Sequence, residues 1–209
     1  RQDPADVAAA DEMMYSMTDF LGFYKDHSYM VTNTMRLLEQ CGFEMTFDRP
    51  KNKLHFTSSK HDDRRLLEKL AYDGLHYRYG SSNKKARERV KNELQVIDRL
   101  GFSAYFLITW DFIRYGQLRG FFHVGRGSGA NSIVAYCMGI TDVDPIDLDL
   151  YFERFLNPHR TSPPDFDIDF SWTDRDEVID YVFKRYGHAH TSLMATYNTF
   201  KGRSILREL

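Results

Sequence analysis

The sequence is poor in cysteine and has no long apolar run. Only two of its 209 residues are cysteines, Cys41 and Cys137, and they do not form a C-x-x-C pair. This excludes a disulfide framework and argues against a zinc–thiolate site, and both thiols are most simply buried, small apolar groups. No stretch approaches the roughly 18 consecutive apolar residues that indicate a membrane span. We therefore expect no membrane segment and a reducing, cytoplasmic setting.

Internal repeats and low-complexity tracts are also missing. The chain starts Arg1-Gln2-Asp3-Pro4, without an initiator methionine or an apolar signal core, so we expect a piece of a longer protein. Its hydrophobic fraction of 42% is ordinary, which excludes a disordered or a fibrous chain. The length suits one large domain or two small ones.

The chain has little net charge, but its acidic and basic residues are concentrated in different parts of the sequence. The formal net charge is −2, yet residues 141–180 carry 12 acidic and 3 basic side chains. The flanks are basic, with 10 bases against 7 acids in residues 61–100 and 5 against 1 in residues 181–209. An acidic block between basic flanks suits a site that holds cations beside a polyanion, and the simpler alternative is a solvated charged surface.

Hydrophobic spacing and glycine or proline breaks predict mostly helices with two short strands. Residues 1–45 have helical spacing, and a domain boundary is expected between about residues 45 and 60. The expected elements beyond it are helices at 64–79, 84–100, 104–119, 132–138 and 174–186 and strands at 121–124 and 165–170.

The run Gly125-Arg126-Gly127-Ser128-Gly129-Ala130 lies between an expected strand and an expected helix. Glycines let backbone N–H groups approach an anion, and a helix beginning just after them adds its positive end. Arg126 and Ser128 supply a guanidinium and a hydroxyl, so the run has the parts of a phosphate-binding loop. It matches neither the Walker A nor the G-x-G-x-x-G pattern, and glycine-rich turns at such positions are often only turns.

The run Asp165-Phe166-Asp167-Ile168-Asp169-Phe170 alternates strictly between acidic and apolar residues. On a strand the three carboxylates share one face. Hard oxygen ligands of this kind select Mg²⁺, Mn²⁺ or Ca²⁺, and two of them can bridge a metal pair about 3.5–4 Å apart for phosphoryl transfer. The alternative is a solvated edge strand whose charges prevent aggregation.

Together the two runs indicate nucleotidyl transfer more strongly than either does alone. In this hypothesis the glycine loop holds the triphosphate of an incoming nucleotide, and the carboxylates hold the metals that activate a 3′-hydroxyl. Arg154 and Arg160 lie between the two runs. They either neutralise phosphate charge or pair with the acids around them.

The chain resembles the family C bacterial DNA polymerases, the alpha subunit of DNA polymerase III and its error-prone paralogue. The resemblance is nearly continuous from about residue 64 to 209, and residues 1–45 more weakly resemble the end of a preceding PHP domain. The runs that carry it most specifically are residues 101–112, 125–136, 139–145, 152–158 and 164–170.

The resemblance implies an α+β fold, a polymerase-beta-like nucleotidyltransferase palm with a mixed sheet flanked by helices, plus an N-terminal helical segment. Residues 1–50 would be the end of the PHP domain, residues 51–196 the first part of the palm, and residues 197–209 the start of the thumb. The implied function is the addition of deoxynucleotides to a primer 3′-hydroxyl in DNA replication.

The resemblance also implies residue roles, cofactors and partners. Asp165 and Asp167 would be two of three metal-binding catalytic aspartates, with Asp169 a nearby acid that is not a primary ligand. The implied nucleotide-phosphate ligands are Arg126, Gly127, Ser128, Arg154 and Arg160, and the implied DNA-binding bases are Lys201, Arg203 and Arg207. Two Mg²⁺ ions, or Mn²⁺, would be the cofactors. Primer–template DNA and dNTPs would bind, with the sliding clamp and other replisome subunits contacting regions outside this chain.

Two departures and two alternatives accompany this interpretation. His123-Val124 stands where family members commonly have Gly-Pro, and the third catalytic aspartate lies outside the chain, so we expect the isolated chain to be inactive. A non-catalytic nucleic-acid-binding module with a structural cation site is the main alternative. A nucleotidyltransferase that acts on a small substrate is a second one, which the long aromatic helix and the basic tail disfavour.

Overall fold

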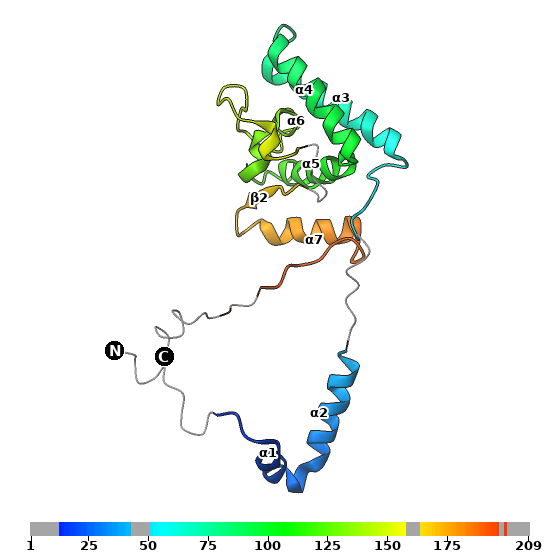
Figure 1. The fold of residues 1–209 in the computed structure, drawn as a ribbon, viewed down its shortest axis with the longest axis vertical. Coiled ribbons are helices and arrows are strands. Elements are labelled where there is room, and N and C mark those ends of the chain that lie inside the picture. The colour runs from blue at the N-terminus through cyan, green and yellow to red at the C-terminus, as the bar shows by residue number, and fades with distance from the viewer. Residues whose placement is uncertain (1–12, 43–50, 158–163, 197–198, 200–209) are drawn as a thin grey trace, which may run out of the picture. The chain divides into compact units, whose positions relative to one another are not determined.

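The computed structural model describes residues 13–42, 51–157, 164–196 and 199, and it divides the chain into two compact units (Figure 1). The units are Arg1–Pro50 and Lys51–Leu209. Their assignment to the end of a PHP domain, a palm and a thumb stays a prediction.

The first unit is a pair of short helices that exposes its apolar side chains. Ser16 caps α1 (Met17–Phe23) by accepting a hydrogen bond from the Asp19 amide, and η2 (Lys25–His27) leads into α2 (Ser28–Gln40). Helix α1, η2 and α2 contain no buried residue. Cys41, which follows α2, is exposed and not buried as expected, because α2 buries none of its residues within the described unit, whereas Cys137 is buried.

Three long helices form the frame of the second unit: α3 (Lys60–Tyr79), α4 (Lys84–Leu100) and α5 (Ser103–Leu118). The ends of α4 are those that the sequence predicts, and those of α5 differ by one residue. Helix α3 begins four residues earlier than expected, because the Ser59 side chain caps it by accepting a hydrogen bond from the Asp62 amide. The Asn83 side chain accepts a hydrogen bond from the Ala86 amide at the start of α4, and Gly101 ends it in the left-handed conformation.

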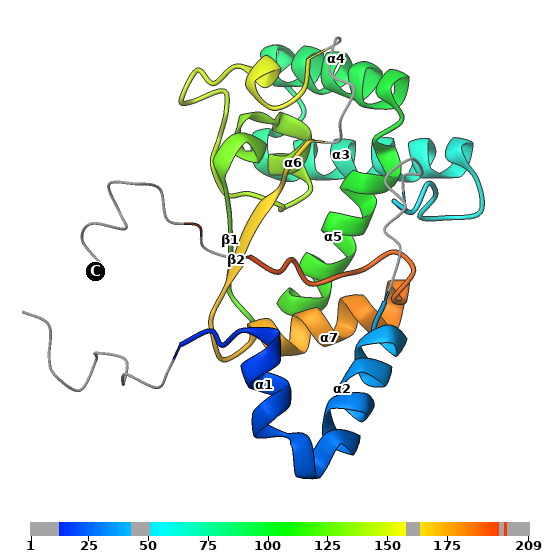
Figure 2. The ribbon, with the colours of Figure 1, turned by 60° about the horizontal axis from the view of Figure 1, so that its bottom comes forward.

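The described residues contain one sheet, in which β1 (His123–Arg126) and β2 (Asp167–Phe170) pair antiparallel (Figure 2). The expected mixed sheet is therefore not present in this part of the chain. The prediction of a strand at 121–124 is wrong by two residues. The reason is that Gly125 and Arg126 continue the ladder opposite the acidic strand, whereas Phe122 is 88% exposed.

Short elements join β1 to the helices. Strand β1 continues directly into the 3-10 helix η3 (Gly127–Asn131), and α6 (Ile133–Cys137) follows after Ser132. Helix α6 lies against α3 with their backbones in contact, since a Cβ atom on Gly74 would stand 1.8 Å from the Cys137 carbonyl oxygen. The 3-10 helix η4 (Phe152–Arg154) comes after a long connection.

Helix α7 (Arg175–Tyr186) packs along α5, next to the sheet (Figure 2). The rings of Tyr115 and Tyr181 stack with centroids 4.0 Å apart. Asp111 of α5 accepts hydrogen bonds from the hydroxyls of Tyr181 and Tyr186 at 2.9 and 2.7 Å. These contacts fix the position of α7 against α5. Because α7 follows β2 in the chain, they also hold the chain that leaves the sheet.

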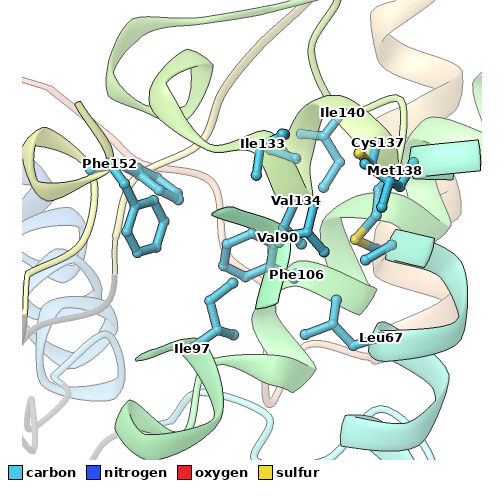
Figure 3. Packing of buried hydrophobic residues seen from close by; sticks show 14 of the residues in the cluster. Leu67, Val90, Ile97, Phe106, Ile133, Val134, Cys137, Met138, Ile140 and Phe152 are labelled. Atoms are coloured by element: carbon cyan, nitrogen blue, oxygen red, sulfur yellow. The ribbon is translucent and has the colours of Figure 1, made fainter. Parts of the chain in front are cut away.

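The core of the second unit lies between α3, α4, α5 and α6 (Figure 3). Leu67, Val90, Phe106 and Val134, one from each helix, are at most 1% exposed. No helix within the described ranges combines the length and the apolar character that crossing a membrane requires.

Candidate functional site

The β1–β2 ladder brings the two predicted motifs together. Arg126 is the register partner of Asp167, and its Nε donates a hydrogen bond of 2.6 Å to Oδ2 of Asp169. Its Nη1 lies 3.5 Å from Oδ2 of Asp167. The hydrogen bond to Asp169, together with the negative charges of Asp169 and Asp167, raises the pKa of Arg126. The prediction that these carboxylates share one face is therefore confirmed for Asp167 and Asp169.

Strand β2 begins at Asp167, two residues later than the expected strand at 165–170, because its partner β1 ends at Arg126, so Asp165 precedes the ladder. The aromatic residue between the two candidate metal ligands anchors this part of the chain. The Phe166 ring stacks on Tyr105 with centroids 5.4 Å apart and contacts Phe106 and Phe155 at 5.1 and 4.7 Å. The Phe166 amide donates to the Tyr105 hydroxyl at 3.0 Å. Since the backbone and the ring are both held, the positions of the acids on either side are fixed by the core.

Two glycines bring η3 against the acidic strand. Gly127 has a φ of +71°, and a Cβ atom there would stand 2.3 Å from Oδ2 of Asp167. A Cβ atom on Gly129 would stand 2.6 Å from Cδ1 of Phe166. Only residues without a side chain allow this approach. The glycine run thus lies directly beside the carboxylates, as a turn of 3-10 helix.

The expectation that the following helix offers its positive end to a phosphate is wrong. The amides of Ile133 and Val134 both donate to the carboxylate of Glu93 at 3.2 Å, and the Ala135 amide donates to Ser132 Oγ at 3.1 Å. A carboxylate of the protein therefore already occupies the N-terminus of α6.

Glu93 was missed because it lies in the middle of α4, outside any recognisable motif. Its signal in the sequence was an acidic residue at the spacing of the buried Val90 and Ile97. It is 2% exposed and also accepts from Ser132 Oγ at 2.8 Å and from Arg89 Nε at 3.1 Å. Burial raises its pKa to about 7, although all four hydrogen bonds favour the ionised form.

The remaining predicted phosphate ligands differ in their surroundings. Ser128 is half-buried in η3, and its backbone carbonyl accepts a hydrogen bond from Nδ2 of Asn131 at 2.8 Å. Arg154 is exposed at the end of η4, which contacts η3, and it makes no ion pair within the described residues. The other predicted bases lie outside the described residues: Arg160, Lys201, Arg203 and Arg207.

The carboxylates at the sheet are suitable ligands for a hard cation, but there are too few of them to surround one. Asp165 is exposed, and the Asp167 side chain is 39% exposed, so both can offer carboxylate oxygens to an ion from solvent. Asp169 is instead held by Arg126. Within the described ranges no group of three His, Cys, Asp or Glu side chains could hold a metal.

Comparison with known proteins gives a consistent result. Residues 65–209 match the family model described as the bacterial DNA polymerase III alpha NTPase domain. An error-prone DNA polymerase of Symbiobacterium thermophilum is 41% identical over 186 residues, which covers 89% of this chain and 17% of that protein. The DNA polymerase III alpha subunit of Halalkalibacterium halodurans is 39% identical over 201 residues, which covers 95% of this chain and 18% of that protein. The DNA polymerase III alpha subunit of Treponema pallidum is 38% identical over 217 residues, which covers 100% of this chain and 18% of that protein.

The chain thus spans less than a fifth of the length of these relatives. The match to the family model extends over well more than half of the chain and includes the glycine run, both candidate metal ligands and Glu93. The chain belongs to the bacterial DNA polymerase III alpha NTPase domain family.

Proposed function

We propose that this chain is part of a longer DNA-directed DNA polymerase, in which it carries two metal-binding carboxylates and the nucleotide-phosphate segment of the palm. The polymerase extends a primer 3′-hydroxyl with dNTPs by two-metal phosphoryl transfer in DNA replication. The observation that carries the proposal is the junction of the two motifs. Arg126 bridges to Asp167 and Asp169, and Gly127 lies against Asp167.

In this proposal each residue has a role that its position supports. Asp165 and Asp167 hold the Mg²⁺ pair, which Mn²⁺ can replace, together with an aspartate outside this chain. When bound there, the ions would supply Lewis-acid stabilisation of the charge that develops during phosphoryl transfer. The chain's own donors to the triphosphate are Ser128 Oγ, the Gly127 backbone and the Arg126 guanidinium, which is more than half exposed.

Bases further along the chain complete the binding surface. Arg154 and Arg160 neutralise phosphate charge, and primer–template backbone is bound by Lys201, Arg203 and Arg207. Sliding clamp and other replisome subunits bind regions outside these 209 residues, in the cytoplasm. Since the third carboxylate is also outside, the isolated chain is expected to be inactive.

Primer extension by the full-length polymerase with Mg²⁺ tests the proposal. The Asp165→Asn/Asp167→Asn double variant should lose extension, because a neutral amide oxygen binds Mg²⁺ far more weakly than a charged carboxylate does. Both side chains lie at the surface, so its thermal stability should stay close to that of wild type. Asp176→Asn is the matched control, an exposed acid on α7, and should extend normally.

Extension that survives in the double variant would contradict the proposal. The carboxylates would then be structural, and the main alternative, a nucleic-acid-binding module with a structural cation site, would predict DNA binding that is salt-dependent yet indifferent to their loss.

A further inference from the structure

Helix α4 carries an ion pair between half-buried Arg89 and fully buried Glu93 that the proposed function does not use. Arg89 and Glu93 are four residues apart on the helix, and the Glu93 side chain is 2% exposed. Burying a carboxylate is unfavourable unless donors satisfy it. Here four donors do so: Arg89 Nε, Ser132 Oγ and the amides of Ile133 and Val134. Such a complete set fixes α4 to the start of α6.

Arg89 extends this connection from Glu93 to the segments around η3. Its Nη2 donates to the Asn131 carbonyl oxygen at 2.8 Å, and its Nη1 donates to the Pro145 carbonyl oxygen at 3.3 Å. The planar guanidinium of Arg89 therefore binds both the last residue of η3 and the connection after α6, and fixes the distance between them.

Asn131 continues the connection to the predicted phosphate ligand. Its Nδ2 donates to the Ser128 carbonyl oxygen at 2.8 Å, and the side chain belongs to a residue that is 4% exposed. A continuous series of hydrogen bonds therefore runs from Glu93 through Arg89 and Asn131 to the backbone of Ser128.

The opposite side of the same segment rests on the acidic strand. Gly127 lies against Asp167 and Gly129 against Phe166. The segment is consequently held between the α4 network on one side and the carboxylate strand on the other. Release of the network would remove the hydrogen bonds that tie the Ser128 backbone to α4 and leave the contacts with the strand, η4 and α6 to set its position.

We propose that Arg89 and Glu93 are positioning residues for the triphosphate of the incoming nucleotide, acting through Asn131 on the Gly127–Ser128 backbone. This inference rests on the proposed polymerase function. The network does not touch the nucleotide or the metals. It sets the place of the groups that do, so its loss weakens nucleotide binding more than it slows the chemical step.

The test compares Arg89→Met with Arg87→Met in the full-length polymerase. Methionine keeps the apolar stem of Arg89 and removes its three hydrogen bonds, while Arg87 is an exposed residue of the same helix without an ion pair in the described part of the chain. For Arg89→Met we expect the KM for dNTP to rise about ten-fold with kcat within about three-fold of wild type, since binding common to ground and transition states is lost. Arg87→Met should change neither.

A second variant keeps the inference testable if Arg89→Met does not fold. Asn131→Ala cuts the series next to Ser128 and leaves the Arg89–Glu93 pair in place, and it should raise the KM in the same way. Hydrogen exchange of amides 127–132, measured without nucleotide or metal, should be faster than in wild type for either variant.

An unchanged KM in the folded variant overturns the inference, as does an equal fall of kcat and kcat/KM. Failure of the proposed function gives a different result, because extension would then persist in the Asp165→Asn/Asp167→Asn variant whatever happens at Arg89.

Discussion

Replacing Gly127 by alanine should damage the carboxylate site far more than the fold. The φ of Gly127 is +71°, and a left-handed backbone costs a residue with a side chain about 1–2 kcal/mol. The added Cβ would stand 2.3 Å from Oδ2 of Asp167 and 3.3 Å from its Cγ. Since the carboxylate is the movable end of a side chain, we expect it to rotate away from Arg126 and from the position in which the proposed function has it bind a metal.

Gly120→Ala separates the two effects. Gly120 has a φ of +80°, and a Cβ atom there would meet nothing within 4 Å. It therefore has the backbone cost of Gly127→Ala without the collision. Both variants should lose about 1–2 kcal/mol of stability, which in a protein of 150–250 residues corresponds to a fall of several degrees in the unfolding temperature.

Primer extension by the full-length polymerase provides the assay. Gly127→Ala should have a kcat/KM at least about ten-fold below that of Gly120→Ala, equivalent to about 1.4 kcal/mol of lost transition-state stabilisation. Equal activities in the two variants would refute the reasoning, because the backbone strain alone would then explain the whole effect.

Two further predictions concern the packing behind the site. Gly74→Ala would place a Cβ atom 1.8 Å from the Cys137 carbonyl oxygen, so α3 and α6 must separate. We expect the free energy of unfolding, measured with denaturant, to fall by about 3 kcal/mol. Asp73→Ala, on the exposed side of the same helix, should change it little. Glu93 has its pKa raised by burial from 4.5 to about 7, so the folded state binds the extra proton between these values. The stability of wild type minus that of Glu93→Gln should therefore fall by up to about 3 kcal/mol as the pH rises from 4.5 to 7 and then level off, and a flat difference would contradict the pKa shift.

Most of the fold could be predicted because its helix boundaries are determined locally. Asn83, Gly80 and Gly101 are cap residues whose conformational preferences act within one helical turn. The bounds of β1 could not be predicted in this way. The apolar run at Phe121 looked like a strand, but the ladder partner, a strand more than forty residues later, decides which residues pair.

The candidate site was predictable where one run of sequence contains the whole pattern. The alternation in residues 165–170 places Asp167 and Asp169 on one face, and Arg126 meets them there. The α6 cap was not predictable, since Glu93 and Ser132 are far apart in the chain and belong to no common motif. An acidic residue at a buried helical position signals a partner but does not identify it.

The position of Glu93 changes how the glycine run can bind a phosphate. In a P-loop the helix that follows the glycines directs its free amides at the anion. Here the first amides of α6 donate to Glu93 and Ser132, and a second anion at the same place would meet a carboxylate. In the proposed polymerase, nucleotide phosphates would then be bound on the other side of η3, by Ser128, by Arg126 and by the backbone of Gly127, which lies against Asp167. Under the proposed function, the buried carboxylate would thus direct the triphosphate toward Asp167 and the other candidate metal ligand, Asp165, an arrangement that suits nucleotidyl transfer.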